Sequence, residues 1–199
     1  MNKKNLRTYE KVNKIMNYFT VGWLWIIMCL PIVTAGASSS AAYKVFKSCM
    51  ENEEGYVIGQ FFKAFKKEFK VSTIVWFIML AAIGLVAGGS YTVVNQAKLF
   101  EEYRHLFIAL YVLEGMLIYF ILVYVFPYVT TFDDTPTVCI KNSFMISVRH
   151  IGNSMLILLA DIAIIGVSLL IYFFLMFAPA ILLYVNAMLI RKVLNIYKK

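Results

Sequence analysis

The sequence predicts an all-α fold, a polytopic transmembrane helical bundle of four to five spans with a basic amphipathic interfacial helix. The chain is 61% hydrophobic and only 15% charged, whereas soluble domains are nearer half apolar and a quarter charged. Several uncharged runs approach the roughly 20 residues that a helical span needs. Lysines and arginines lie at the flanks of these runs. We therefore expect one integral membrane domain over residues 1–199, located in the cell membrane.

The apolar runs give the expected elements in chain order. A first apolar segment covers 16–34, and small residues after it permit a tight turn into a second helix over 38–50. An interfacial helix over 55–70 comes next. Further spans are expected at about 71–94, 106–126, 155–173 and 176–192, the last two being joined by a tight turn.

Two glycines in the span over 71–94 suggest close helix packing. Gly84 and Gly88 stand at GxxxG spacing, which lets a neighbouring helix approach closely. The motif is common by chance in apolar segments, so it supports tight packing inside the bundle more than dimerisation.

The interfacial helix has an aromatic face and a basic face. At about 100° per residue, Ile58 and four phenylalanines fall in one sector of roughly 100°, and four lysines fall in a separate sector. The rings would enter the acyl boundary while the lysines meet anionic lipid headgroups. The residues of this membrane or partner interface are Phe61, Phe62, Lys63, Phe65, Lys66, Lys67, Phe69 and Lys70. The alternative is an amphipathic helix packed on a protein core.

The distribution of basic residues favours one topology. If 16–34 crosses the membrane singly, the better orientation places 12 of the 19 basic residues inside and 7 outside. If this segment enters and returns with 38–50, at the break near Pro31, 17 lie on the cytoplasmic side and 2 outside. The 17 fall in four basic regions, which are the segment before the first span, 44–70, 127–153 and the C-terminus. The second arrangement satisfies the positive-inside rule far better. We prefer this re-entrant hairpin, with both termini cytoplasmic, and a single crossing with a weaker bias stays open.

Three polar residues, Glu114, Asp161 and Asn186, stand within the apolar runs. A charge at the centre of a span costs about 2.5–3.5 kcal/mol on insertion scales, so such acids face a bundle interior, find a partner or stay protonated. The functional interpretation is a proton, cation or solute site that uses Glu114 and Asp161. The structural interpretation is a polar contact, for instance with Asn186 or a tyrosine hydroxyl.

The sequence contains no recognisable catalytic set. Ser38–Ser40 lacks the context of a nucleophile elbow, and neither the two histidines nor the three cysteines have metal-ligand spacing. We expect no catalytic residues, no cofactor and no metal, and hence no enzyme. The net charge of +8 reflects the flanks of the spans and not a nucleic-acid partner. The oligomeric state stays open.

Five stretches form an ordered set of landmarks from Leu30 to Leu194. They are Leu30–Ser38, Glu53-Glu54-Gly55, Phe61–Lys66 with Phe69-Lys70, Phe132–Thr135 and Asn186–Leu194. Together they resemble the YesL family of small, uncharacterised integral membrane proteins of Gram-positive bacteria. Glu114 and Asp161 are not among the matched landmarks.

The resemblance implies a role beside carbohydrate uptake, because members of that family are often encoded next to binding-protein-dependent sugar importers and carbohydrate-degrading enzymes. We therefore expect an accessory or regulatory membrane protein linked to carbohydrate uptake. Its expected partners are anionic lipids of the bilayer and subunits of a sugar ABC transporter. The alternative is a small solute or proton-coupled transporter or channel that uses Glu114 and Asp161.

Overall fold

The computed structural model describes residues 3–51, 56–95 and 103–197, and all regular structure within these ranges is helical. The elements are α1 (Lys3–Cys29), η1 (Ile32–Thr34), α2 (Ala35–Met50), α3 (Val57–Asn95), α4 (Arg104–Thr131), α5 (Pro136–Arg149), α6 (Ile151–Leu170), η3 (Tyr172–Met176) and α7 (Ala178–Tyr197). Four of these helices, α3, α4, α6 and α7, are long and apolar enough to cross a membrane. The predicted all-α bundle with membrane-spanning character is confirmed.

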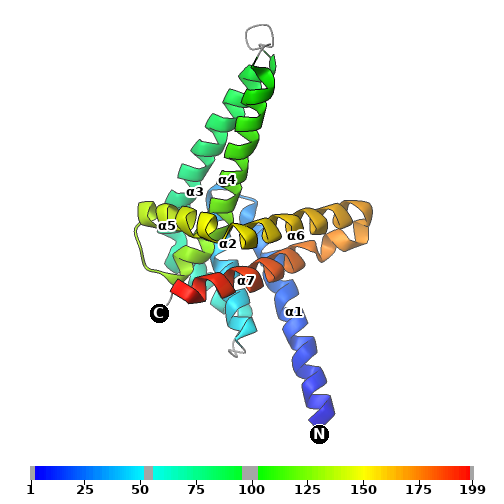
Figure 1. Ribbon diagram of the computed structural model, residues 1–199. Coiled ribbons are helices and arrows are strands. Elements are labelled where there is room, and N and C mark those ends of the chain that lie inside the picture. Colours follow the sequence, from blue (N-terminus) through cyan, green and yellow to red (C-terminus); the bar gives the residue numbers. More distant parts are fainter. Residues whose placement is uncertain (1–2, 52–55, 96–102, 198–199) are drawn as a thin grey trace.

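Helix α2 lies at the centre of the core. It packs against α1, α3, α4 and α7 and is surrounded by them in Figure 1. Ten of its 16 residues are buried, and most of these are glycine, alanine or serine. Small side chains let several helices approach one axis closely. The largest fully buried side chains of the core, on α2, α3, α4, α6 and α7, are Phe46, Phe61, Tyr124, Ile157, Ile190 and Leu194.

Helices α1 and α2 form an antiparallel hairpin joined by η1. Near the turn, the Ser38 hydroxyl donates to the Trp25 carbonyl oxygen at 3.0 Å. Farther from the turn, the rings of Tyr18 and Phe46 stack with centroids 5.2 Å apart. The chain therefore reverses at the segment where the sequence suggests a return. The depth of this hairpin in a membrane stays a prediction.

Gly36 permits the closest contact between α2 and α3. A Cβ atom at this position would lie 2.6 Å from the Ser72 carbonyl oxygen and 2.7 Å from Trp76 Cβ. One turn farther along α2, the buried hydroxyls of Ser40 and Ser72 are hydrogen-bonded at 2.7 Å. The Trp76 indole Nε1 donates to the Ile32 carbonyl oxygen at 2.7 Å. Backbone proximity and paired polar groups thus hold α3 against the hairpin.

Helix α3 differs from expectation in two respects. The interfacial helix over 55–70 and the span over 71–94 belong to one unbroken helix, although Gly55 lies outside the described residues. A change in side-chain pattern does not interrupt backbone hydrogen bonding, and no proline stands in α3 to break it. In addition, no atom lies within 4 Å of the Cβ position at Gly84 or Gly88. The predicted tight packing at these glycines inside the bundle is therefore wrong.

Two helical hairpins project from the core in different directions. Helices α3 and α4 run side by side toward one end, while α6 and α7 run side by side toward another (Figure 1). The expected spans over 71–94 and 106–126 fall within α3 and α4, and η3 occupies the turn expected between the last two spans. The position of the membrane boundaries along these helices stays a prediction.

Candidate functional site

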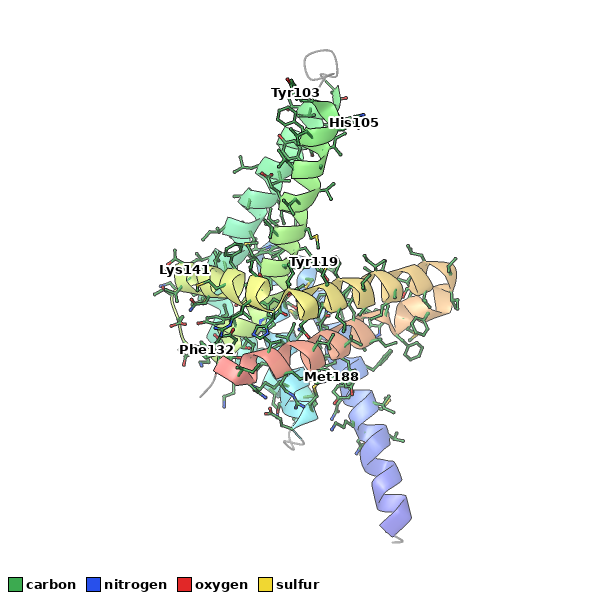
Figure 2. All side chains as sticks on the ribbon, viewed as in Figure 1. Tyr103, His105, Tyr119, Phe132, Lys141 and Met188 are labelled. Carbon is green, nitrogen blue, oxygen red and sulfur yellow. The ribbon has the colours of Figure 1, made fainter. Side chains whose placement is uncertain are left out.

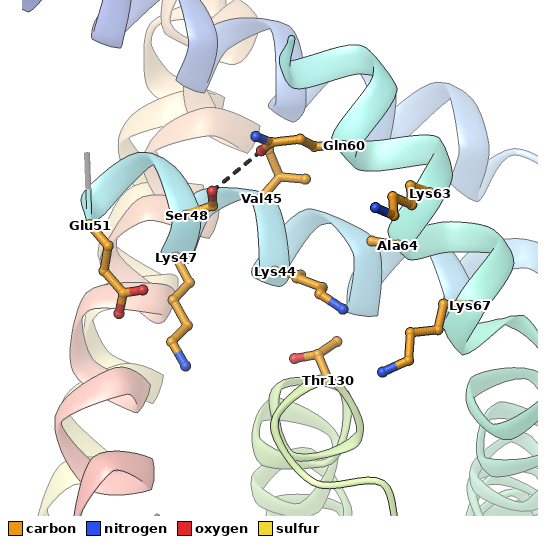
Figure 3. Close-up of a pocket in the computed structure, with 10 residues that line it drawn as sticks. All are labelled: Lys44, Val45, Lys47, Ser48, Glu51, Gln60, Lys63, Ala64, Lys67 and Thr130. Carbon is orange, nitrogen blue, oxygen red and sulfur yellow. Dashed lines mark hydrogen bonds between the residues drawn. The ribbon is translucent and has the colours of Figure 1, made fainter. Parts of the chain in front are cut away.

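A cavity of about 650 Å³ opens between α2, the first half of α3 and the end of α4. Four lysines line it, two from α2 and two from α3 (Figure 3). The complete lining is Lys44, Val45, Lys47, Ser48, Glu51, Gln60, Lys63, Ala64, Lys67 and Thr130. The cavity is therefore markedly basic at its wall.

Helical spacing explains why the four ammonium groups converge. Lys44 and Lys47 are three residues apart on α2, and Lys63 and Lys67 are four apart on α3, so each pair shares one side of its helix. The two helices pack through small side chains such as that of Ala64, which is 4% exposed. Close packing of the helices brings both lysine pairs to the same cavity.

A buried acid, Glu68, lies behind two of these lysines. Its side chain is only 6% exposed, and its Oε1 atom lies 3.5 Å from Lys44 Nζ and 3.6 Å from Lys67 Nζ. Neither contact has hydrogen-bond geometry, so the attraction is one of charge. A buried carboxylate requires such compensation. Glu68 therefore fixes the positions of two ammonium groups at the cavity wall.

Lys67 also joins α3 to the connection between α4 and α5. Its ammonium group donates to Asp133 Oδ1 at 3.0 Å. The neighbouring Asp134 accepts a hydrogen bond from the Tyr128 hydroxyl at 2.7 Å, and Tyr128 stacks on Phe132 with ring centroids 4.5 Å apart. Figure 2 shows Phe132 at this end of α4. Lys67, which stands between the two parts of the Phe/Lys landmark (Phe61–Lys66 and Phe69-Lys70), thus contacts the Phe132–Thr135 landmark.

Other contacts gather the basic segments at the same end of the core. Arg191 Nη1 of α7 lies 4.0 Å from Glu51 Oε1 at the end of α2. His150 Nε2 and the Tyr197 hydroxyl are 3.1 Å apart. Lys14 of α1 and Arg191 line one surface hollow. Each of the four basic regions that the charge count groups together, the first of them through Lys14, therefore has residues at this end of the core.

The phenylalanines predicted for the membrane interface have different environments. Phe61 is fully buried in the core and Phe65 is half-buried, whereas Phe62 and Phe69 are 37% and 38% exposed. The buried seam of α3 is Val57, Phe61, Ala64, Glu68, Ser72, Val75 and Met79. Its centre lies roughly 75° around the helix from the centre of the aromatic face. At Phe61, the structure matches the alternative of a helix packed on a protein core.

The lysines predicted for the interface also divide into two groups. Lys63 and Lys67 line the cavity. Lys66 and Lys70 are exposed, do not line it, and have no ion-pair or hydrogen-bond partner among the described residues. They are four residues apart and so present adjacent charges on one side of α3. The basic face of α3 thus continues beyond the cavity.

Asp161 lies in a buried polar cluster between α4, α6 and α7. Its Oδ2 atom accepts hydrogen bonds from the Tyr119 hydroxyl at 2.6 Å and from Asn186 Nδ2 at 3.2 Å. Figure 2 shows Tyr119 on α4 beside α6. Asp161 Oδ1 and Asn186 Oδ1 are buried and have no hydrogen-bond partner among the described residues. The structural interpretation of Asp161, contact with Asn186 and a tyrosine, matches this geometry.

Glu114 does not join this cluster. It is exposed on α4, and its position is about 140° around the helix from that of Tyr119. No ion pair or hydrogen bond links Glu114 to any described residue. Glu114 and Asp161 therefore occupy separate environments, one on the outer surface and one within the bundle.

Sequence reasoning missed Glu68, Lys44 and Lys47. A signal for Glu68 was present, because it is the one acid among the lysines of 58–70 and an isolated acid on a packed helix calls for a cationic partner. No comparable signal marked Lys44 and Lys47, since their role depends on how α2 packs against α3. Within the described residues, no group of three His, Cys, Asp or Glu side chains could hold a metal ion.

One family matches the sequence in part. The family described as protein of unknown function DUF624, the YesL-like family of membrane proteins, matches residues 18–88. This stretch contains the second half of α1, all of α2 and most of α3, and hence all four cavity lysines. No curated protein and no solved structure matches the chain. Residues 18–88 are thus similar to a family of membrane proteins without an assigned activity.

Proposed function

We propose that this chain is a YesL-like membrane protein of a Gram-positive bacterium and acts as an accessory or regulatory component of carbohydrate uptake, not as an enzyme. The observation that carries the proposal is the exposed face of α3, where Lys66 and Lys70 have no partner among the described residues. Exposed Phe62 and Phe69 extend this face. Exposed rings beside unpaired ammonium groups suit a surface that meets anionic headgroups and an acidic protein partner.

The sidedness of this surface is part of the proposal. We place the α3 lysines, the connection over 127–153 and both termini in the cytoplasm, with α1 and α2 as a re-entrant hairpin. The contacts of Lys67 with Asp133 and of Arg191 with Glu51 support this arrangement, because they join segments that the charge count assigns to one side. The positive-inside rule then gives the side.

The expected partner is a membrane or nucleotide-binding subunit of a sugar importer encoded near this protein. The link to sugar import rests on the resemblance of the landmarks to the YesL family. The chemistry of the partner rests on the exposed lysines, which would pair with acidic side chains. An accessory role requires only such a contact and no reaction chemistry in this chain.

Transport by the chain itself is the less supported alternative. Glu114 and Asp161 lie in separate environments, and Asp161 Oδ2 already accepts hydrogen bonds from Tyr119 and Asn186. A shared polar path would need both acids at one cavity. Proteoliposomes with the wild-type chain should therefore show no more proton or solute flux than empty vesicles. Flux that falls in Glu114→Gln and Asp161→Asn would instead establish the alternative.

The proposed function can be tested by co-purification with charge-reversed variants. In mild detergent, the wild-type chain should recover a subunit of the neighbouring sugar importer, and the double variant Lys66→Glu with Lys70→Glu should recover less. Lys141→Glu is the matched control, since Lys141 is an exposed lysine of α5 (Figure 2). Recovery of no importer subunit, together with unchanged growth on the sugar after deletion of the gene, would refute the proposal.

A further inference from the structure

Most of the hydrogen-bond donors that the cavity between α2 and α3 offers to a ligand are cationic. The Ser48 hydroxyl donates to Gln60 Oε1 at 3.3 Å, and the Thr130 hydroxyl donates to the Pro127 carbonyl oxygen at 2.9 Å. Both hydroxyl protons are therefore directed to protein acceptors. The remaining side-chain donors at the wall are the Gln60 amide nitrogen and the ammonium groups of the four lysines, and of these only the ammonium groups are charged (Figure 3).

The acids around the cavity leave its wall positive. Glu51 is the one carboxylate among the lining residues, and Arg191 lies 4.0 Å from it. Glu68 is buried behind the wall, 3.5 Å from Lys44 Nζ and 3.6 Å from Lys67 Nζ. Asp133, which is exposed and does not line the cavity, accepts a hydrogen bond from Lys67 at 3.0 Å. The four lysines and Arg191 still outnumber these three acids. Lys63 has no ion-pair or hydrogen-bond partner among the described residues. Like charges gathered in this way repel one another, and a bound anion would relieve that repulsion.

The size and the donor type indicate the class of ligand. A cavity of about 650 Å³ lies within the range of small-molecule sites, roughly 300–1,000 Å³. A phosphate group carries up to two negative charges and three acceptor oxygens, so it can engage several ammonium groups at once, whereas a carboxylate carries a single charge. Lysine is an established point-charge ligand of phosphate.

We propose that this cavity binds a phosphate-bearing anion, with Lys44, Lys63 and Lys67 as its main ligands. Glu68 acts as a positioning residue because it fixes Lys44 and Lys67 without lining the cavity. The phosphate group belongs either to the headgroup of an anionic phospholipid or to a soluble phosphorylated molecule. The site does not depend on the protein partner of the proposed function, since Lys66 and Lys70 lie outside it.

The test uses the full chain in phosphatidylcholine nanodiscs with inorganic pyrophosphate as the probe, followed by calorimetric titration. The wild-type chain should bind the probe saturably. Lys63→Gln and Lys44→Gln should each weaken binding about fivefold, the effect of losing one lysine near a phosphate surface. Lys66→Gln is the control, because it removes the same charge from the same helix outside the cavity, and it should change affinity less than about twofold. Among the described residues Lys63 has no ion-pair or hydrogen-bond partner to lose, so its variant should keep the wild-type melting temperature.

A second arm distinguishes the two sources of phosphate. If the natural occupant is a lipid headgroup, nanodiscs that also contain phosphatidylglycerol should weaken the apparent affinity for pyrophosphate by competition. If the occupant is soluble, the affinity should be the same in both nanodiscs. Either result supports the cavity as a phosphate site. Absence of saturable pyrophosphate binding by the wild-type chain, or equal losses in Lys63→Gln and Lys66→Gln, would overturn it.

Discussion

Replacement of Gly36 by alanine tests the packing of α2 on α3 directly. The new Cβ would lie 2.6 Å from the Ser72 carbonyl oxygen and 2.7 Å from Trp76 Cβ, whereas ordinary contacts begin at 3.4 Å. Both obstructing atoms are fixed to the backbone of α3, so no side-chain rotation can relieve the clash. The two helices would have to separate by about 0.8 Å at this point, the difference between 3.4 and 2.6 Å.

The free energy of unfolding that Gly36→Ala loses through this separation can be calculated from its parts. Overpacking of a core costs about 1–3 kcal/mol. The Ser40–Ser72 hydrogen bond, now 2.7 Å long, would stretch toward 3.5 Å and lose about 1 kcal/mol of stabilisation. Alanine regains up to about 1 kcal/mol through its higher helix propensity. The net loss of unfolding free energy should be about 2 kcal/mol, which corresponds to about 4–8 °C in melting temperature for a chain of this size.

The assay is thermal unfolding in one detergent, followed by far-ultraviolet circular dichroism. Gly84→Ala is the matched control, because its Cβ position is in open space and it has the same gain in helix propensity. We expect Gly84→Ala to unfold no lower than the wild-type chain. A Gly36→Ala variant as stable as Gly84→Ala would refute the close contact between α2 and α3.

Three further predictions concern separate parts of the molecule. Asp161→Ala should lower the free energy of unfolding by about 2 kcal/mol, because the Tyr119 hydroxyl loses its hydrogen-bond acceptor. Glu114→Gln should leave the melting temperature nearly unchanged. Equal losses in the two variants would contradict the separate environments of Glu114 and Asp161. Burial raises the pKa of the Cys139 thiol to about 11, so at pH 8 its thiolate should be about a hundredfold scarcer than that of a thiol with a pKa of 9.0. Iodoacetamide should therefore spare Cys139 until pH rises toward 11 or denaturant is added, as mass spectrometry would show, and rapid labelling of the native protein at pH 8 would count against its burial. Lys66→Cys in a cysteine-free chain should react with an impermeant maleimide only after the cells are permeabilised, and labelling from outside would reject the re-entrant topology.

The helical nature of the chain follows from local sequence, whereas helix boundaries depend partly on context. Pro31 and the small residues after it indicate a break, and the structure has η1 there. The boundary expected near residue 70 is absent, because α3 contains no residue that stops backbone hydrogen bonding. A periodicity analysis detects the change in side-chain pattern at this point but not the continuity of the helix.

Packing faces were harder to predict than helices. The aromatic face of α3 carries the phenylalanines of 58–70, yet the buried seam is offset from it and contains Glu68 and Ser72. Which side of α3 is buried depends on α2. The small side chains of α2 allow close approach, Lys44 of α2 pairs with Glu68, and Ser40 of α2 pairs with Ser72. Gly84 and Gly88 show the same limit of prediction from sequence. Their GxxxG spacing indicates a helix surface that another helix could approach closely, but it does not show that a helix does so.

The sequence by itself determined that this chain is an all-α bundle with membrane-spanning character, because long apolar runs flanked by lysines have few other stable arrangements. It also identified Asp161 and Asn186 as polar exceptions that need partners. Only the tertiary structure decided that these two residues meet each other and Tyr119, that Glu114 stands apart, and that four lysines from two helices share one cavity. The physical reason is that helical periodicity fixes which residues share a face, whereas the partner of that face is fixed by packing between distant segments.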